Sequence, residues 1–161
     1  MHVDAEDTAG DSGKGMSMTQ RTLGSLVIRR CRTDEVEAVV LLWRLAEAVP
    51  SPTDTVANLR WAVESKQTAV LVGEDEGTIV GSVIAGFDGW RGNLYRLAVH
   101  PKYRRRGIAR ALAAAAEEWL LAQGAQRNTA LVERDRPWAV AFWQAAGYHV
   151  DPHMARFVRN I

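Results

Sequence analysis

The apolar positions along the chain follow two different spacings. Short runs rich in β-branched residues and bounded by glycine, proline or polar residues are typical of β-strands. Longer stretches in which apolar residues recur every three or four positions are typical of amphipathic helices. The strand pattern occurs at residues 23–31, 68–73, 78–87, 92–100 and 128–133, and one or two further strands are predicted within 148–158.

The helical spacing predicts four helices between these strands, over residues 33–49, 53–64, 108–123 and 137–146. Their ends carry suitable residues: Thr33 can cap a helix start, Pro137 suits a first turn, and Gly124 and Gly147 suit the position after a helix end. Residues 74–77, three acidic residues followed by a glycine, predict a hairpin turn. The resulting order is β-α-α-β-β-β-α-β-α-β, which predicts an α/β (α+β) protein.

The N-terminal segment differs in composition from the rest of the chain. Its first 20 residues hold four acidic residues, one lysine and three glycines, with no apolar periodicity. Such a composition predicts a disordered tail over residues 1–23, followed by one domain over 24–161. The chain has neither a signal peptide nor a run of about 20 apolar residues, so a cytoplasmic protein without membrane attachment is predicted.

The charge balance narrows the choice of partners. The chain has 20 basic and 19 acidic residues, a net charge of +1. The N-terminal segment carries −3 of this, so the rest of the chain has a net charge of +4. A body of this charge, without a second basic stripe, argues against a nucleic-acid partner. A single cysteine, Cys31, excludes an internal disulfide and a cysteine-rich zinc pattern, and no metal is expected.

A basic turn lies directly before the predicted helix at 108–123. Unpaired N–H groups at a helix start, together with the helix dipole, attract anions, and the small residues Gly107 and Ala109 let a ligand approach the backbone. A basic cluster at this end opposes the dipole, so stability alone does not favour it. The turn predicts a pyrophosphate site; the alternative is a solvated basic turn. Its basic residues are Lys102, Arg104, Arg105, Arg106 and Arg110.

Two motifs in this part of the chain resemble those of the GNAT superfamily of N-acyltransferases. The first is Arg/Gln-x-x-Gly-x-Gly/Ala after a strand that ends in Val-x-Pro, and it stands here as Arg104-Arg105-Arg106-Gly107-Ile108-Ala109 after Val99-His100-Pro101. The second is an apolar helix that ends in aromatic-x-x-x-Gly-aromatic, here Phe142-Trp143-Gln144-Ala145-Ala146-Gly147-Tyr148. The element order matches as well, so the resemblance covers about residues 24–161. It implies a mixed, mostly antiparallel sheet flanked by helices.

The resemblance implies transfer of an acetyl group from acetyl-CoA to a primary amine, by direct attack within a ternary complex. In the family, the strand before the loop splays from its neighbour and its backbone binds the pantetheine arm, which falls here on Leu97, Ala98 and Val99. A backbone N–H there would polarise the thioester carbonyl. Arg136 and Trp143 are also expected beside the cofactor. The pyrophosphate would lie on the loop formed by Arg104, Arg105, Arg106, Gly107, Ile108, Ala109 and Arg110.

The acid–base residues depart from the family pattern. Trp143 stands where many members have a tyrosine that protonates the leaving thiolate, Arg136 replaces an asparagine, and Leu131 replaces a glutamate. Because tryptophan has no ionisable proton, it cannot act as a general acid. Glu133 and Tyr95 are the residues we select for proton transfer, from a set that also includes His100 and Asp88.

These departures leave a second function open, a non-catalytic CoA-binding module of the same fold. The acceptor is not identified by the sequence: a protein N-terminus, an antibiotic, a polyamine, an amino acid or another small amine all fit. The two early helices carry Trp43 and Trp61, which face either the acceptor groove or the core. A free edge strand would also allow a homodimer.

Overall fold

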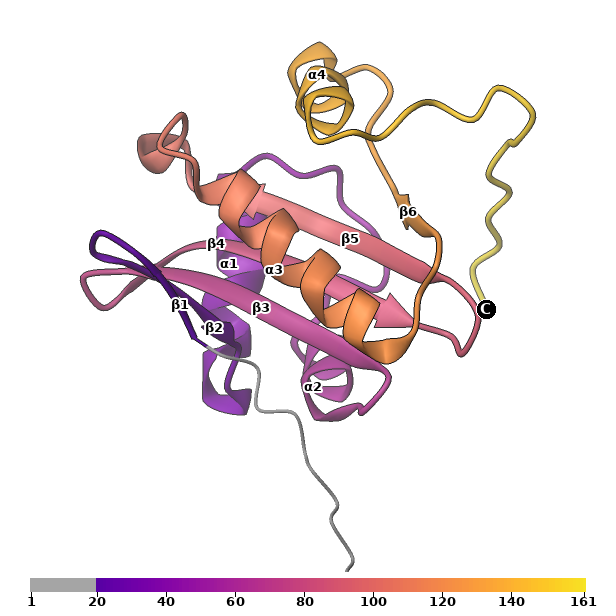
Figure 1. Ribbon diagram of the computed structural model, residues 1–161. Helices are drawn as coiled ribbons and strands as arrows, with labels where there is room; N and C mark the ends of the chain where they lie inside the picture. Colours follow the sequence, from indigo (N-terminus) through magenta and orange to yellow (C-terminus); the bar gives the residue numbers. More distant parts are fainter. Residues whose placement is uncertain (1–19) are drawn as a thin grey trace, which may run out of the picture.

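A computed structural model of the chain describes residues 20–161 (Figure 1). The strands are β1 (Arg21–Leu23), β2 (Leu26–Arg30), β3 (Thr68–Asp75), β4 (Thr78–Phe87), β5 (Gly92–Val99) and β6 (Asn128–Ala130). The helices are α1 (Val36–Leu45), α2 (Val56–Glu64), α3 (Ile108–Gln123) and α4 (Pro137–Ala145), with short 3₁₀ turns η1 (Thr33–Glu35) and η2 (Pro101–Tyr103).

The six strands form one sheet in the order β1-β2-β3-β4-β5-β6. Every neighbouring pair is antiparallel except β5 and β6, which run parallel. The parallel pair follows from the connection, because α3 carries the chain from the end of β5 back to the start of β6. The predicted fold class, a mixed and mostly antiparallel sheet flanked by helices, is confirmed.

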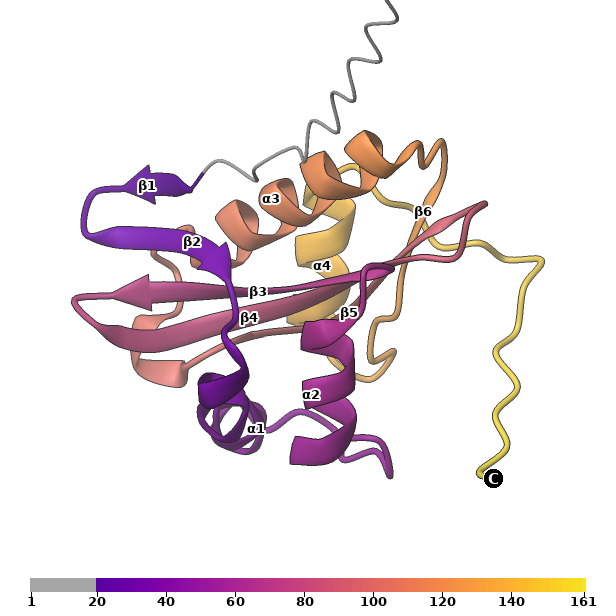
Figure 2. The ribbon, with the colours of Figure 1, turned by 90° about the horizontal axis from the view of Figure 1, so that it is seen from below.

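Helices cover both faces of the sheet, with α1 and α2 on one face and α3 on the other, whereas α4 lies beyond the β5 edge (Figures 1 and 2). Alternate side chains of the central strands supply the two cores, as period-2 strands require. On β3, Ala69 and Leu71 pack toward α3, whereas Val70 and Val72 pack toward α1 and α2. The α3 side is the larger cluster and includes the fully buried Leu112, Ala116 and Leu120, at helical spacing.

Some predicted element boundaries were wrong. The predicted strand at 23–31 is two strands joined by a turn, in which Gly24 has φ +62°. Arg21–Leu23 pairs with β2, although it lies in the segment expected to be a tail. Residues 1–19 of the predicted tail lie outside the described residues. The first helix is shorter than predicted, since residues 33–35 form a 3₁₀ turn and α1 ends at Leu45.

The strands predicted within residues 148–158 are absent from the structure, where this segment is irregular. Asp151 explains part of the difference, because its carboxylate accepts a hydrogen bond from the His153 N–H (3.0 Å) and pairs with Arg127 (3.2 Å). Such a local turn competes with strand pairing, and Pro152 has no N–H to give to a sheet.

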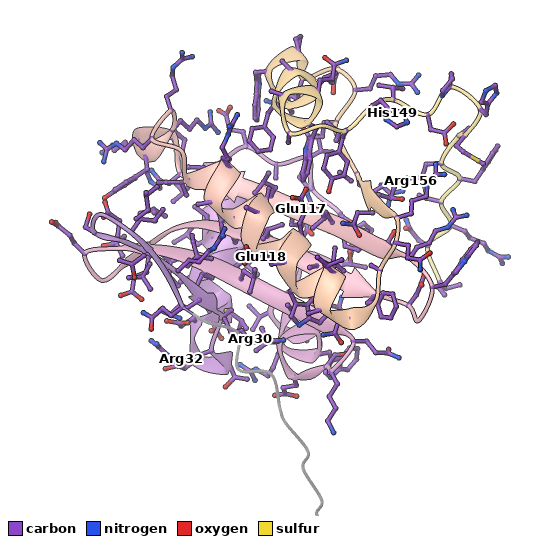
Figure 3. All side chains as sticks on the ribbon, viewed as in Figure 1. Arg30, Arg32, Glu117, Glu118, His149 and Arg156 are labelled. Atoms are coloured by element: carbon purple, nitrogen blue, oxygen red, sulfur yellow. The ribbon has the colours of Figure 1, made fainter. Side chains whose placement is uncertain are left out.

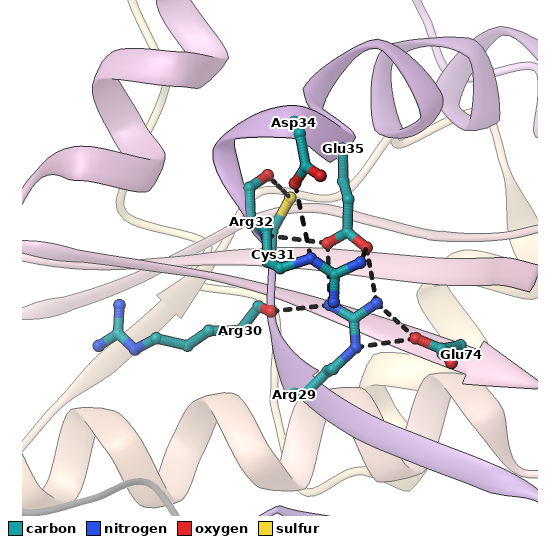
Figure 4. Close-up of polar contacts among 7 residues, drawn as sticks. All are labelled: Arg29, Arg30, Cys31, Arg32, Asp34, Glu35 and Glu74. Carbon is teal, nitrogen blue, oxygen red and sulfur yellow. Dashed lines mark hydrogen bonds and ion pairs between the residues drawn. The ribbon is translucent and has the colours of Figure 1, made fainter. Parts of the chain in front are cut away.

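An ion-pair network fastens η1 to the sheet (Figure 4). The Arg29 guanidinium donates to both carboxylate oxygens of Glu35, at 2.8 and 2.7 Å, and its Nε donates to Glu74 at 2.8 Å. Arg32 also pairs with Glu35, at 2.6 Å. The hydrogen bonds from Arg29 lower the pKa of Glu35, so this half-buried carboxylate is held in its charged form.

Candidate functional site

The sheet opens between β5 and β6. The two strands pair only over Gly92–Leu94, and the last bond between them runs from the Leu131 N–H to the Leu94 oxygen (3.2 Å). Beyond that point β6 leads away to α4, so the rest of β5 has an unpaired edge (Figure 1). Arg96, with φ +52°, lies at a bulge in the pairing with β4 and shifts the register of this free edge.

The register decides which backbone groups of β5 face the opening. The His100 N–H donates to the Val80 oxygen on β4 (2.8 Å), and Ala98 lies opposite Ser82. Since backbone groups alternate along an antiparallel strand, Ala98 also bonds toward β4, while Leu97 and Val99 present theirs to the opening. Of the three residues expected to bind the pantetheine arm, Leu97 and Val99 direct their backbone groups to the opening, where the Val99 oxygen already accepts a hydrogen bond from Arg104 (3.3 Å).

The loop after β5 exposes a series of unpaired N–H groups. Arg105 and Gly107 both have positive φ, at +62° and +79°, which turns the chain sharply into α3. Within residues 20–161, the N–H groups of 105–110 donate to no other atom of the chain. Adjacent unpaired N–H groups at the start of a 16-residue helix make an anion-binding concavity. The unpaired N–H groups thus lie where the sequence places the anion loop, and the binding of an anion there stays a prediction.

The basic side chains of this loop divide into two groups. Lys102, Arg105, Arg106 and Arg110 are exposed around the loop. Arg104, in contrast, turns toward the open edge of β5, where its Nε donates to the Val99 oxygen at 3.3 Å and its Nη2 to the Ala46 oxygen at 3.1 Å. Its guanidinium also lies 5.4 Å from the ring centre of Trp138. The Arg104 guanidinium thus has two carbonyl acceptors within the protein, and its expected role at the cofactor stays a prediction.

A hollow between α3 and α4 continues from the anion loop. Small side chains from both helices leave this space open, and Figure 3 shows Glu117 on the side of α3 that faces α4. Glu117 accepts a hydrogen bond from the Tyr148 hydroxyl (2.8 Å), which ties the end of α4 to α3. The hollow is lined by Arg110, Ala113, Ala114, Glu117, Ala145 and Ala146.

On the opposite face of the sheet, the segment between α1 and α2 approaches the open edge of β5. Arg96 donates to the Val49 oxygen (2.9 Å) and pairs with Asp54 (2.5 Å). The Val49 N–H donates to Glu133 at 2.8 Å, and the other oxygen of Glu133 pairs with Arg136 at 3.1 Å. The structure thus brings the predicted Glu133 and Arg136 together beside this segment.

No local pattern in the sequence indicates Arg96 and Asp54, because their partners lie more than 40 residues away along the chain. Arg136, expected beside the cofactor, pairs with Glu133 and donates to the Glu47 oxygen (3.0 Å). A long-range contact of this kind has no local pattern that a sequence could display.

The aromatic candidates lie in different environments. Tyr95 is 36% exposed on the α1–α2 face of β5, and burial raises the pKa of its hydroxyl, with nearby Arg156 lowering it and Asp88 raising it. Trp143, expected beside the cofactor, is 7% exposed and packs edge-on against Phe142 and Tyr148, so the structure places it in the core. Its apolar ring suits that position.

Trp43 and Trp61 also differ in burial. Trp43 is buried against the sheet, whereas Trp61 is 71% exposed on α2. Within residues 20–161, no three His, Cys, Asp or Glu side chains are placed to hold a metal ion. No helix in that range is both long and apolar enough to cross a bilayer.

Comparison with known proteins agrees with this geometry. Residues 36–148 match the Acetyltransferase (GNAT) family. An acetyltransferase of Yersinia pestis (strain Pestoides F) is 36% identical over 121 residues, which cover 75% of this chain and 86% of the relative. The chain therefore belongs to the GNAT family and is a GNAT-type acetyltransferase.

Solved structures share the fold. The structure of AAC(6')-Iy in complex with the bisubstrate analogue CoA-S-monomethyl-acetylneamine has a TM-score of 0.69 at 20% identity, covering 84% of this chain and 98% of that one. The PaiA N-acetyltransferase of Thermoplasma acidophilum in complex with coenzyme A has a TM-score of 0.71 at 18% identity, covering 79% of this chain and 91% of that one. At these identities the likeness concerns the fold.

Proposed function

We propose that the protein transfers an acetyl group from acetyl-CoA to a primary amine of a small-molecule or peptide acceptor, by direct attack in a ternary complex. The observation that carries this proposal is the free edge of β5 next to the anion loop. Leu97 and Val99 present backbone groups to the opening, and the unpaired N–H groups of residues 105–110 follow directly. A cytoplasmic location is part of the same proposal.

Each part of acetyl-CoA, the acetyl donor, can be assigned to particular residues. The pyrophosphate is assigned to the N–H groups of residues 105–110, with the exposed arginines around them. The pantetheine arm is assigned to the free edge at Leu97 and Val99 and to the hollow between α3 and α4. The two fold neighbours described above hold CoA or a CoA analogue, which supports this assignment. The Leu97 or Val99 N–H then polarises the thioester carbonyl.

An acceptor amine with a low pKa needs little help from a general base, because much of it is already neutral near pH 7. Holding donor and amine together supplies much of the rate by proximity. A lysine-like amine with a pKa near 10.4 costs about 4.6 kcal/mol to deprotonate at pH 7, whereas an α-amine near 8 costs about 1.4 kcal/mol. We assign the proton acceptor to Glu133, through water, and the proton donor for the leaving thiolate to Tyr95.

The contacts of these two residues support the roles. Glu133 lies beside the 46–49 segment with one oxygen on the Val49 N–H and the other on Arg136, so its carboxylate is fixed in place. The Tyr95 hydroxyl carries its proton at neutral pH, as a general acid must before the transfer, because its ordinary pKa of 10.0 is already well above 7 and burial raises it further.

The test is a thiol-release assay with acetyl-CoA against a panel of amines that includes α-amino acids, N-terminal peptides, polyamines and aminoglycosides. The protein's own thiol does not interfere, because burial, with a smaller contribution from Glu35, raises the pKa of Cys31 to about 12. Thiol release that depends on one class of amine supports the proposal. Saturable binding of CoA without turnover on any amine overturns it in favour of a non-catalytic CoA-binding module.

A further inference from the structure

Three arginines from different parts of the chain bond to one short segment, residues 46–49, which follows α1. Arg104 donates to the Ala46 oxygen at 3.1 Å, Arg136 to the Glu47 oxygen at 3.0 Å, and Arg96 to the Val49 oxygen at 2.9 Å. The three arginines come from the anion loop, from the start of α4 and from the bulge of β5.

The carbonyl groups at the end of α1 favour such partners. The last carbonyls of a helix lack intrahelical donors and carry the negative end of the dipole, so charged N–H donors stabilise them. Arg96 holds a positive φ of +52°, which is uncommon for a residue with a side chain and persists where surrounding contacts enforce it. The N–H groups of residues 46–48 bond back to carbonyls of α1, so the three arginines add long-range contacts to a segment that is also held locally.

Arg104 differs from the other two arginines. Arg96 and Arg136 each have a carboxylate partner, Asp54 and Glu133, whereas both hydrogen bonds of Arg104 within the described chain go to carbonyl oxygens. Its backbone belongs to the anion loop, and its side chain spans from the Val99 oxygen on the open edge to the Ala46 oxygen. Arg104 thus links the anion loop, where acetyl-CoA is proposed to bind, to residues 46–49 after α1.

We propose that Arg104 is a positioning residue that couples the anion loop to residues 46–49. The proposal rests on the proposed function only for the identity of the ligands. Residues 46–49 border the opening between β5 and β6, because Arg96 on β5 donates to the Val49 oxygen and Glu133 after β6 accepts from the Val49 N–H. CoA bound at the loop then tightens the segment through Arg104.

Hydrogen–deuterium exchange on the full chain tests the coupling, since the amides of the segment are bonded. The N–H groups of Ala46, Glu47 and Ala48 donate to carbonyls of α1, and that of Val49 donates to Glu133. Without ligand, Arg104→Ala is expected to speed exchange in this segment at least about tenfold, the effect of losing a charge-assisted hydrogen bond. Arg21→Ala, which removes an exposed arginine of β1 paired with Glu118, is the matched control and should leave it unchanged.

Adding CoA separates positioning from phosphate binding. CoA is expected to slow exchange of residues 46–49 in the wild type and in Arg21→Ala, but not in Arg104→Ala, although Arg104→Ala still binds CoA within about threefold of the wild-type Kd by calorimetry. Arg105→Ala should show the reverse, with weaker CoA binding and unchanged exchange in the free protein. Arg104→Lys, which keeps the charge but not the two-armed geometry, should restore part of the protection.

Several results would overturn the proposal. One is equal exchange of residues 46–49 in wild type and Arg104→Ala; another is CoA-induced protection that survives the substitution. A third is a loss of affinity in Arg104→Ala for CoA but not for pantetheine, which lacks the pyrophosphate, because that pattern identifies Arg104 as a phosphate ligand. If CoA does not bind the wild type at all, the proposed function fails, whereas the exchange in the free protein still tests the link from Arg104 to the segment.

Discussion

The indole N–H of Trp43 donates a hydrogen bond to the Ser82 hydroxyl across 2.9 Å in the interior of the protein. Trp43 is 3% exposed and Ser82 is fully buried, so water cannot replace either partner. Ser82 lies opposite Ala98 on β5, next to the residues that face the sheet opening. The bond therefore fixes α1 to the strand that supports the free edge of β5.

Substituting Ser82→Ala is expected to lower the free energy of unfolding by about 1–3 kcal/mol, because the buried indole N–H loses its only acceptor. Urea denaturation followed by far-UV circular dichroism measures the change. Trp43→Phe in the Ser82→Ala background is the control: removing the donor as well should give a combined loss smaller than the sum of the two single losses. Strict additivity would show that the bond contributes nothing.

The conformation of Gly107 allows its structural and functional roles to be separated. Gly107 and Gly77 have nearly the same φ, +79° and +81°, and an added Cβ would meet nothing within 4 Å at either position. Alanine at either site should therefore cost a similar amount, about 1–2 kcal/mol, from the left-handed backbone alone. Gly107→Ala should in addition weaken CoA binding at least about tenfold, because the Cβ obstructs the approach of an anion to the loop amides.

Calorimetric titration with CoA, beside a thermal melt of each variant, checks this prediction. Gly77→Ala lies in the β3–β4 turn and is the matched control, expected to lose stability but to keep wild-type affinity. Equal CoA affinity in the two variants would remove Gly107 from the binding loop.

The anion loop was predicted from the sequence because all its parts are adjacent. A strand, a basic turn, Gly107 and a helix start follow one another, so their local signals suffice to place them. Trp43 and Ser82, in contrast, are 39 residues apart, and the contact between Arg136 and Glu47 spans 89. Only the folded sheet brings such residues together, which is why the contacts of residues 46–49 and of the Arg104 side chain have no local signal in the sequence.

The C-terminal segment illustrates the opposite failure. Its apolar residues indicated strands within 148–158, yet Val150, Phe157 and Val158 are exposed in the structure. An apolar run forms a strand only where a neighbouring strand offers an edge to pair with. The nearest strand along the chain, β6, is only three residues long and pairs with β5. The local turn at Asp151 and the missing N–H of Pro152 override the propensity.

Glu35 should make stability depend on pH in the acid range. Its folded pKa lies below the ordinary value of 4.5, so it contributes stability above about pH 4.5 that is lost as the pH falls through the lowered pKa. Glu35→Gln is expected to cost about 1–3 kcal/mol at pH 7, because Arg29 and Arg32 lose a charged partner. The difference from wild type should shrink steadily toward pH 2.

Urea denaturation at several pH values measures this dependence. Glu37→Gln is the matched control, since the Glu37 side chain is 62% exposed and lies 3.6 Å from Arg60, and such surface pairs contribute less than about 0.5 kcal/mol. A Glu35→Gln difference that stays the same from pH 7 to pH 2 would contradict the assignment of the charge.

Tyr95→Phe tests the proton donor. If Tyr95 protonates the leaving thiolate, the variant should lower kcat by roughly 100-fold or more, the usual contribution of a general acid, and leave the KM for acetyl-CoA unchanged. Because burial raises the pKa of Tyr95 above its ordinary value of 10.0, wild-type kcat should show no loss of this acid between pH 6 and 9. Glu133→Gln should instead lower kcat/KM for the amine most strongly at low pH, where a base is needed most. Steady-state kinetics across that range, with an amine that the panel identifies, separates the two residues. A Tyr95→Phe enzyme with wild-type kcat would show that the thiolate leaves without this acid.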